Sequence, residues 1–198
     1  MTKETSGNLA ALTDEALMLH YKEGDVAAFD QLFKRYKDGL YQYVVRYLGD
    51  RSAAEDVFGD VWERLVRASD RYQQTAKFKT YLFTLTRNRM IDHYRSQSGG
   101  TGQLIVDKSE AELGNLAEPS GRGPEQDSFL QECLEFLKSG LLELPEAQRE
   151  VLLLYMETDM TLEHIGQVID SNRETVKSRL RYARDKLKEI VPEECYES

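Results

Sequence analysis

The sequence predicts an all-α fold of two small helical domains joined by a flexible acidic linker. Three observations support this prediction. Apolar residues recur with a helical period through most of the 198 residues, and no segment shows a useful length of the alternation that strands require. Residues 98–124 contain six glycines and two prolines, a composition typical of a linker between domains. Hydrophobic residues make up 40% of the chain, which is enough for a packed core.

The N-terminal domain is expected over residues 13–97, after a disordered N-terminus at 1–12. Thr13 precedes two acidic residues, which favours a helix start because the helix dipole attracts negative charge there. Gly24 ends this helix and Asp25 caps the next, whose apolar stripe runs to residue 48. Ser52 opens a third helix, and a fourth is predicted over residues 77–97. Together these segments predict an N-terminal helical bundle.

The C-terminal domain is expected over residues 126–191, between a linker at 98–125 and a tail at 192–198. Its helices are predicted at about 126–139, 146–157, 161–169 and 172–190. Only a polar break at 170–172 separates the last two, which is the layout of a helix-turn-helix. Ser171 and Glu174 have the spacing of a capping box that opens the last helix. The second half is therefore predicted to be a four-helix domain with a helix-turn-helix.

The apolar runs, the cysteine and histidine spacing and the motifs of the sequence argue against a secreted, membrane-spanning, metal-binding or enzymatic protein. No apolar run approaches the roughly 20 residues of a membrane span, and the polar N-terminus has no secretory signal. Cys133 and Cys195 stand 62 positions apart, which argues for a reducing cytoplasm and against a disulfide. Cys133 is expected in the core and Cys195 in a frayed tail. The three histidines are dispersed, and no P-loop or catalytic triad is found. We therefore expect a cytoplasmic, non-catalytic protein without metal, cofactor or direct membrane insertion.

The net charge of −9 conceals two basic segments. Residues 173–188 carry seven basic and two acidic side chains, and residues 77–95 carry five basic and one acidic. Residues 96–146, between them, carry ten acidic and three basic side chains. This asymmetry favours two contacts with a polyanion, joined by a segment that stays off the polyanion or mimics it. Solvated helix faces that happen to cluster are the alternative.

The last predicted helix has an apolar side and a cationic side. At about 100° per residue, its buried stripe consists of Val176, Leu180, Ala183 and Leu187. The basic residues at 173, 177, 181, 184 and 188 gather roughly 60–140° round from that stripe. The side that cannot join the core is thus cationic, as a helix that enters the DNA major groove requires. A basic helix exposed only to solvent is the alternative.

The helix predicted at 77–97 combines basic with aromatic residues and is apolar on two sides. Phe78, Leu82 and Leu85 share one side, whereas Phe83 and Met90 lie roughly opposite. One side must pack into the bundle, and the other must meet a neighbouring helix or a ligand. Single-stranded DNA suits the second role, because cations follow its backbone and aromatic rings stack on its bases.

Several blocks of the sequence resemble the extracytoplasmic-function (ECF) sigma factors, which are the small members of the sigma-70 family of RNA polymerase sigma factors. In the C-terminal half these blocks are LPE at 144–146, VLLL at 151–154, TLExI at 161–165 and TVKSRL at 175–180. In the N-terminal half they are GDxxAF at 24–29, AEDV at 54–57 and the segment 81–95. Asp170 stands where the family usually has glycine in the turn, and Gly59 where it often has glutamine. The turn is expected to survive, because Asp tolerates left-handed conformations.

The resemblance covers about residues 13–97 and 126–190, and it implies a promoter-specific transcription initiation factor. Residues 13–97 would be sigma region 2, which binds core polymerase and recognises and melts the −10 element. Residues 126–191 would be sigma region 4, which reads the −35 element. The implied −35 contacts are Arg173, Glu174, Thr175, Lys177, Ser178, Arg181, Arg184 and Lys188. The implied −10 contacts are Lys77, Phe78, Lys79, Tyr81, Arg87, Asn88 and Arg95, with the loop 72–79 accepting a flipped base.

The resemblance also implies the protein partners. Glu55, Asp56, Asp60 and Trp62 would face the clamp helices of the largest polymerase subunit, and region 4 would meet the flap of the second-largest. A core position is the competing role for Trp62. An anti-sigma factor is a further implied partner. A helix-turn-helix transcriptional regulator that acts without core polymerase is the alternative function, and an interaction module without DNA contacts would not need the cationic face.

Overall fold

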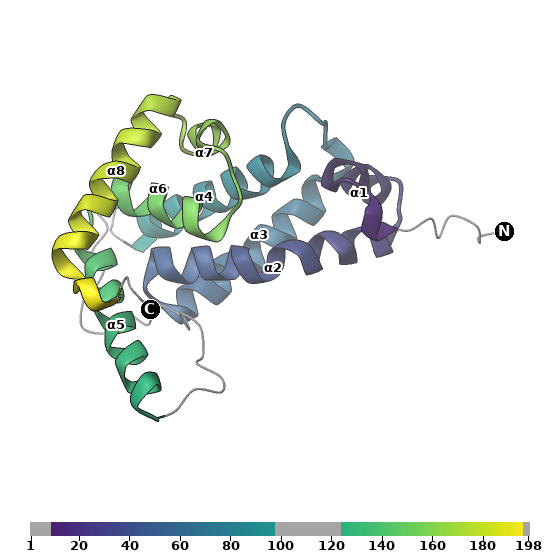
Figure 1. Ribbon diagram of the computed structural model, residues 1–198. Helices are drawn as coiled ribbons and strands as arrows, with labels where there is room; N and C mark the ends of the chain where they lie inside the picture. The colour runs from purple at the N-terminus through teal and green to yellow at the C-terminus, as the bar shows by residue number, and fades with distance from the viewer. Residues whose placement is uncertain (1–8, 98–123, 196–198) are drawn as a thin grey trace.

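The computed structural model describes residues 9–97 and 124–195, and within them every regular element is a helix, which confirms the all-α prediction (Figure 1). The first four α-helices are α1 (Asp14–Lys22), α2 (Val26–Leu48), α3 (Arg51–Ala68) and α4 (Phe78–Gln97). The next four are α5 (Pro124–Glu143), α6 (Glu146–Glu157), α7 (Leu162–Ile169) and α8 (Arg173–Ile190). Short 3₁₀ helices lie at Leu9–Ala11, Ser69–Arg71 and Glu193–Cys195. The predicted linker falls almost wholly outside the described residues.

The starts of the first three helices follow from their capping side chains. The Thr13 side chain accepts a hydrogen bond from the Ala16 N–H, and the Asp25 carboxylate accepts one from Ala27. The cap at Asp25 was predicted, and Thr13 was predicted to mark the start of α1. The prediction that Ser52 opens α3 is wrong, because the Asp50 carboxylate caps this helix by accepting from the Ala53 N–H. The left-handed Gly49, with φ of 69°, ends α2 immediately before that cap.

The N-terminal group of helices is built around α2, which packs against α1, α3 and α4. Its core is rich in aromatic rings that are held in tilted or edge contacts. The ring of Tyr36 lies 5.6 Å from that of Phe78, and the ring of Tyr43 lies 5.5 Å from that of Phe83. Because Phe78 and Phe83 are both buried, the two apolar sides of α4 are both occupied by protein. The second side of α4 therefore meets a neighbouring helix, which was one of the two alternatives.

The N-terminus departs from its prediction at residues 9–12, which are packed rather than disordered. Leu9 and Leu12 lie against the hydrophobic core. The Arg35 guanidinium on α2 donates to the carbonyl oxygens of Ala10 and Leu12, at 2.7 and 2.9 Å. Residues 1–8 lie outside the described part of the chain. The boundary of the first helical group is therefore nearer residue 9 than residue 13.

The C-terminal group is centred on α8, whose buried residues are the four predicted from the helical wheel: Val176, Leu180, Ala183 and Leu187. Helices α5, α6 and α7 each contact α8. A Cβ on Gly140 of α5 would lie 2.6 Å from a methyl carbon of Leu187, so the glycine permits the close approach of α5 and α8. The opposite, N-terminal end of α5 projects away from the other helices (Figure 1).

The expectation of two unpaired cysteines is wrong. A disulfide joins Cys133 of α5 to Cys195 in the last 3₁₀ helix. Because α8 packs against α5, the chain that leaves α8 passes beside α5 and brings Cys195 within reach. The tail is thus tied to the domain at residue 195, and Cys133 is a bridging residue rather than an isolated core thiol.

The two groups of helices pack against each other through α2 with α6 and α4 with α7 (Figure 1). Polar contacts between described residues cross this boundary. Arg87 of α4 pairs with Glu150 of α6 at 2.8 Å, and the Tyr47 hydroxyl donates to Glu146 at 2.8 Å. Arg46 pairs with Glu157. The structure is thus a closed arrangement, in which the helix-turn-helix lies over part of α4.

Candidate nucleic-acid interfaces

The helix-turn-helix is formed by α7, the turn 170–172 and α8. Asp170 adopts a left-handed conformation with φ of 53° and ψ of 55°, as predicted for this turn. The expected capping box is wrong, because Asn172 rather than Ser171 caps α8 and accepts from the Thr175 N–H at 2.8 Å. A Cβ on Gly166 would lie 2.5 Å from the Ser171 carbonyl oxygen, so α7 and the turn touch closely. These contacts fix the first turn of α8 relative to α7.

The cationic side of α8 is exposed, as the predicted major-groove role requires. Lys177, Arg181, Arg184 and Lys188 line a shallow groove that extends to Tyr155 of α6. The Arg184 guanidinium lies 4.9 Å from the centre of the Tyr155 ring, and that of Arg181 lies 4.8 Å from the Tyr182 ring. Both tyrosines are exposed. The face thus combines positive charge with aromatic surface.

The start of α8 has a mixed polar character. Arg173 pairs with Glu163 at 2.6 Å and with Glu174 at 3.0 Å, and all three side chains are more than half exposed. Such exposed pairs contribute little to stability, so Arg173 can exchange them for a phosphate. Thr175 and Ser178 are half-buried, and the Ser178 hydroxyl donates to the Thr175 carbonyl at 3.0 Å. All eight residues predicted for the −35 contact thus lie on one helix.

The residues predicted for the −10 contact divide into exposed and buried groups. Lys77, Asn88 and Arg95 are exposed, and Lys79 is half-buried with its ammonium 5.9 Å from the centre of the Tyr36 ring. Phe78, predicted as a −10 contact, is 0% exposed, so its side chain presents no surface to DNA in this arrangement. The period of α4 places it on the side that packs against Tyr36.

Tyr81 and Arg87 are already engaged by protein groups. The Tyr81 ring lies 5.6 Å from that of Tyr72, and partial burial raises the pKa of the Tyr81 hydroxyl. Arg87 pairs with Glu150 of α6, a residue that is only 4% exposed. Burial outweighs the attraction of Arg87 and raises the pKa of the Glu150 carboxyl. In the closed arrangement Arg87 is therefore not free to meet a nucleic acid.

The four residues predicted to bind polymerase lie on α3. Glu55 and Asp56 are exposed, and Glu55 is 3.3 Å from Arg51. Asp60 accepts from Arg89 of α4 at 2.7 Å. Trp62 is 6% exposed and packs with its ring 4.9 Å from that of Phe33. Of the two roles considered for Trp62, the structure therefore shows the core position, because this side chain belongs to an aromatic cluster beneath the α3 surface.

The charged residues at the boundary between the two helical groups were missed by the sequence reasoning. Arg46, Arg149 and Glu150 are each less than 10% exposed. Their signal in the sequence is a charged residue inside an apolar run, since Arg46 interrupts the stripe of α2 and Arg149 and Glu150 precede the apolar run at 151–154. Such a position predicts an ion pair but does not identify the partner.

In the described ranges, no group of three or more His, Cys, Asp or Glu side chains has an arrangement that could hold a metal ion. No helix there is long and apolar enough to cross a bilayer.

Two family models match the chain, and both belong to one family. Sigma-70 region 2 matches residues 32–99, and sigma-70 region 4 matches residues 140–189. Together these matches cover more than half of the chain.

Curated relatives and solved structures agree with the family models. The ECF sigma factor SigW of Bacillus subtilis is 28% identical over 84% of this chain and 90% of its own length. The ECF sigma-E factor of Escherichia coli K12 is 29% identical over 88% of this chain and 92% of its own. A chain in the structure of CnrH in complex with the cytosolic domain of CnrY matches over 89% of this chain and 95% of its own length, with a TM-score of 0.64 at 23% identity. RpoE of Bartonella quintana, solved with the anti-sigma factor NepR, covers 82% of this chain and 95% of its own, with a TM-score of 0.63 at 22% identity.

Proposed function

Because this chain belongs to the sigma-70 family and is an ECF sigma factor that directs promoter-specific transcription, we propose that its two basic helices divide the recognition of one promoter. In this proposal α8 reads the −35 element, and α4 with the loop before it recognises and melts the −10 element. The observation that carries the proposal is the exposed cationic side of α8, presented by a helix-turn-helix.

For the −35 element, α8 enters the major groove with its first turns. The side chains at 173, 174, 177, 178 and 181 reach base edges or nearby phosphates, whereas Arg184 and Lys188 contact phosphates farther along the backbone. The exposed rings of Tyr155 and Tyr182 border this contact. Positive charge supplies affinity that depends on salt, and the side chains at base edges supply sequence preference.

For the −10 element, the exposed residues of the loop 72–77 and of α4 meet single-stranded DNA. Lys77, Lys79 and Arg95 follow the phosphates of the non-template strand, and Asn88 contacts the same strand. Phe78 holds the loop from beneath and does not stack on a base. Arg87 joins the contact only after it leaves Glu150, so this role requires the two helical groups to separate.

The acidic surface of α3 is the proposed polymerase contact. Glu55 and Asp56 face outward and meet the clamp helices of the largest subunit, with Asp60 beside them. Region 4 meets the flap of the second-largest subunit. Phosphodiester chemistry belongs to the polymerase, and this chain contributes positioning alone. We further propose that an anti-sigma factor binds it, because both solved structures named above contain a second protein, and that it acts in the cytoplasm.

The decisive experiment adds the purified chain to core RNA polymerase on a supercoiled library of promoters. Selective transcripts are expected, and repression or silence would favour a helix-turn-helix regulator that acts without polymerase.

Lys177→Ala, on the cationic face, should weaken promoter binding by the holoenzyme and lower the slope of log affinity against log salt by about 1. Lys186→Ala is the matched control, because Lys186 lies on the same helix and pairs with Glu189 outside the groove. Equal effects of the two substitutions would contradict a specific role for this face.

A further inference from the structure

The loop between the 3₁₀ helix Ser69–Arg71 and α4 is exposed along its length and buried at both ends. Residues 73–77 are exposed, whereas Tyr72 is 5% and Phe78 is 0% exposed. Inside the loop one backbone hydrogen bond is described, from the Thr75 N–H to the Gln73 carbonyl. The conformation of these five residues therefore depends strongly on where the two ends are held.

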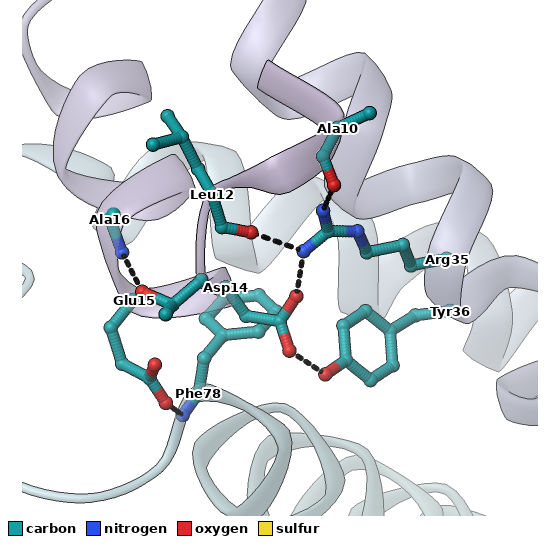
Figure 2. Close-up of polar contacts among 9 residues, drawn as sticks. Ala10, Leu12, Asp14, Glu15, Ala16, Arg35, Tyr36 and Phe78 are labelled. Atoms are coloured by element: carbon teal, nitrogen blue, oxygen red, sulfur yellow. Dashed lines mark hydrogen bonds and ion pairs between the residues drawn. The ribbon is translucent and has the colours of Figure 1, made fainter. Parts of the chain in front are cut away.

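Helix α1 holds both ends of this loop. The Lys22 ammonium donates to the Tyr72 carbonyl at 3.0 Å, and the Phe78 N–H donates to the Glu15 carboxylate at 2.9 Å (Figure 2 shows the second contact). Glu15 and Lys22 lie seven residues apart, which is about 10 Å along one face of a helix. The two bonds thus set the distance between the loop ends to match the separation of Glu15 and Lys22 along α1.

The contact of Glu15 is the stronger of the two on physical grounds. Its side chain is buried, with 8% of the residue exposed, and it accepts from a backbone N–H in the first turn of α4. Such an N–H has no partner within its own helix, and the helix dipole favours a negative charge there. Because this carboxylate is buried, few other polar groups compete with the Phe78 N–H for it. The hydrogen bond therefore fixes the position of Phe78.

Helix α1 is itself held firmly. The Asp14 carboxylate accepts from the Arg35 guanidinium at 2.6 Å and from the Tyr36 hydroxyl, both on α2 (Figure 2). The same guanidinium binds the carbonyl oxygens of Ala10 and Leu12, which precede α1. Contacts with α2 therefore fix the position of α1, and Glu15 and Lys22 of α1 in turn fix the two ends of the exposed loop.

We propose that Glu15 and Lys22 are positioning residues for the −10 element, which fix the shape of the loop 72–78 and thereby decide which flipped base of the single strand it accepts. This inference rests on the proposed function. Neither side chain needs to touch DNA. A pocket for one base must keep its walls within a fraction of an ångström, and a five-residue loop achieves this only when both of its ends are fixed.

The test is transcription by the holoenzyme from a plasmid library randomised across the −10 region, with the base preference at each position read by sequencing. Glu15→Ala should reduce the preference at one position by about tenfold, the effect of one lost hydrogen bond to a charged group, and leave the other positions unchanged. Lys22→Met should reduce the preference at the same position by a smaller factor, because Lys22 is exposed and its contact is the weaker of the two. Glu15→Gln should retain the preference, because its amide oxygen still accepts from the Phe78 N–H. Glu23→Gln, at the C-cap of α1, is the matched control, since Glu23 is exposed and has no described contact with the loop.

The outcomes separate this inference from the function on which it rests. A uniform fall in transcription, with every base preference retained, would mean that the two residues act only on stability and would overturn the inference. If Glu15→Ala fails to fold, Glu15→Asp, which shortens the side chain, and Lys22→Met, at an exposed position, decide in its place. A wild-type chain that selects no promoter would overturn the proposed function together with this inference, whereas a selective wild type with unaltered variants would overturn this inference alone.

Discussion

Two helical glycines, Gly59 and Gly166, differ in what surrounds them and therefore in what an added methyl group should do. A Cβ on Gly59 of α3 would meet nothing within 4 Å, so Gly59→Ala should raise the free energy of unfolding by about 0.5–1 kcal/mol. A Cβ on Gly166 would lie 2.5 Å from the Ser171 carbonyl oxygen, so Gly166→Ala should lower the free energy of unfolding by about 1–3 kcal/mol. Urea unfolding followed by Trp62 fluorescence reports the first variant, and far-ultraviolet circular dichroism the second.

A loss of stability in Gly59→Ala would contradict the open space beside this glycine. If Gly59→Ala is stable and yet binds core polymerase poorly, the glycine marks a close approach of the polymerase to α3. The resemblance to ECF sigma factors, in which glutamine is common at this position, makes the substitution informative.

At the scale of single residues, the sequence predicted those properties that depend on neighbours along the chain. Thr13 was predicted to mark a helix start, Asp25 to cap a helix, and Asp170 to tolerate the turn, because each effect acts within three residues. The choice between Ser171 and Asn172 as the cap of α8 depends on a shift of one residue, which periodicity does not resolve. The burial of Phe78 required knowledge of which side of α4 faces α2, whereas a core position for Trp62 was already one of its two expected roles.

At the scale of elements, the disulfide between Cys133 and Cys195 ties the C-terminal tail to α5. It closes a loop of 62 residues, and the chain-entropy relation gives up to about 4 kcal/mol of stabilisation for such a loop. Reducing agent should therefore lower the hydrogen-exchange protection of α5 and the end of α8 in the wild type. Cys133→Ser and Cys195→Ser should show the lower protection without reducing agent and no further response to it. An unchanged wild type under reduction would contradict a stabilising role for the bridge.

The bounds of the helices were largely predictable, whereas the contacts between them were not. Helix α6 was predicted at its observed bounds, and α7 and α8 within one residue, because apolar period and turn residues are local signals. Helix α5 extends farther than its prediction at both ends. The disulfide was missed since its cysteines meet only after α8 has returned along α5, and no local pattern contains that information.

At the scale of the whole molecule, the closed arrangement opposes the proposed −10 contact. Helix α7 packs on α4, and Arg87 is paired with Glu150, so part of the −10 face is covered while the cationic side of α8 remains open. Because the two contacts are proposed to act at separate promoter elements, the groups must part when the holoenzyme forms. Weak promoter binding by the free chain is the expected consequence.

Gly39 of α2 offers a way to open this arrangement. A Cβ there would lie 3.2 Å from the Glu157 carbonyl oxygen of α6, so the larger side chain of Gly39→Leu should separate the two helical groups. Small-angle X-ray scattering should show a larger radius of gyration for this variant, and single-stranded DNA with the −10 sequence should bind it more tightly than it binds the wild type. Gly59→Ala, whose added Cβ would meet nothing within 4 Å, should leave both measurements unchanged. An unaltered radius in Gly39→Leu would contradict the closed arrangement in solution.

The closed arrangement should also respond to pH through Glu150. This carboxyl faces Arg87 of α4, Glu146 and Arg179, and burial raises its pKa despite the attraction of Arg87. When the groups separate, the carboxyl returns to water and to its ordinary pKa. The closed form therefore binds more protons between these two pKa values, so its stability should rise as the pH falls through the raised pKa and be lowest above it. Scattering at stepwise decreasing pH, from above the raised pKa toward the ordinary one, should show the wild type becoming more compact, and Glu150→Gln, which keeps an acceptor for Arg87 without the charge, should be closed throughout. Acid-induced opening that disappears in Glu150→Gln would mean instead that the attraction of Arg87 outweighs the burial of the carboxylate.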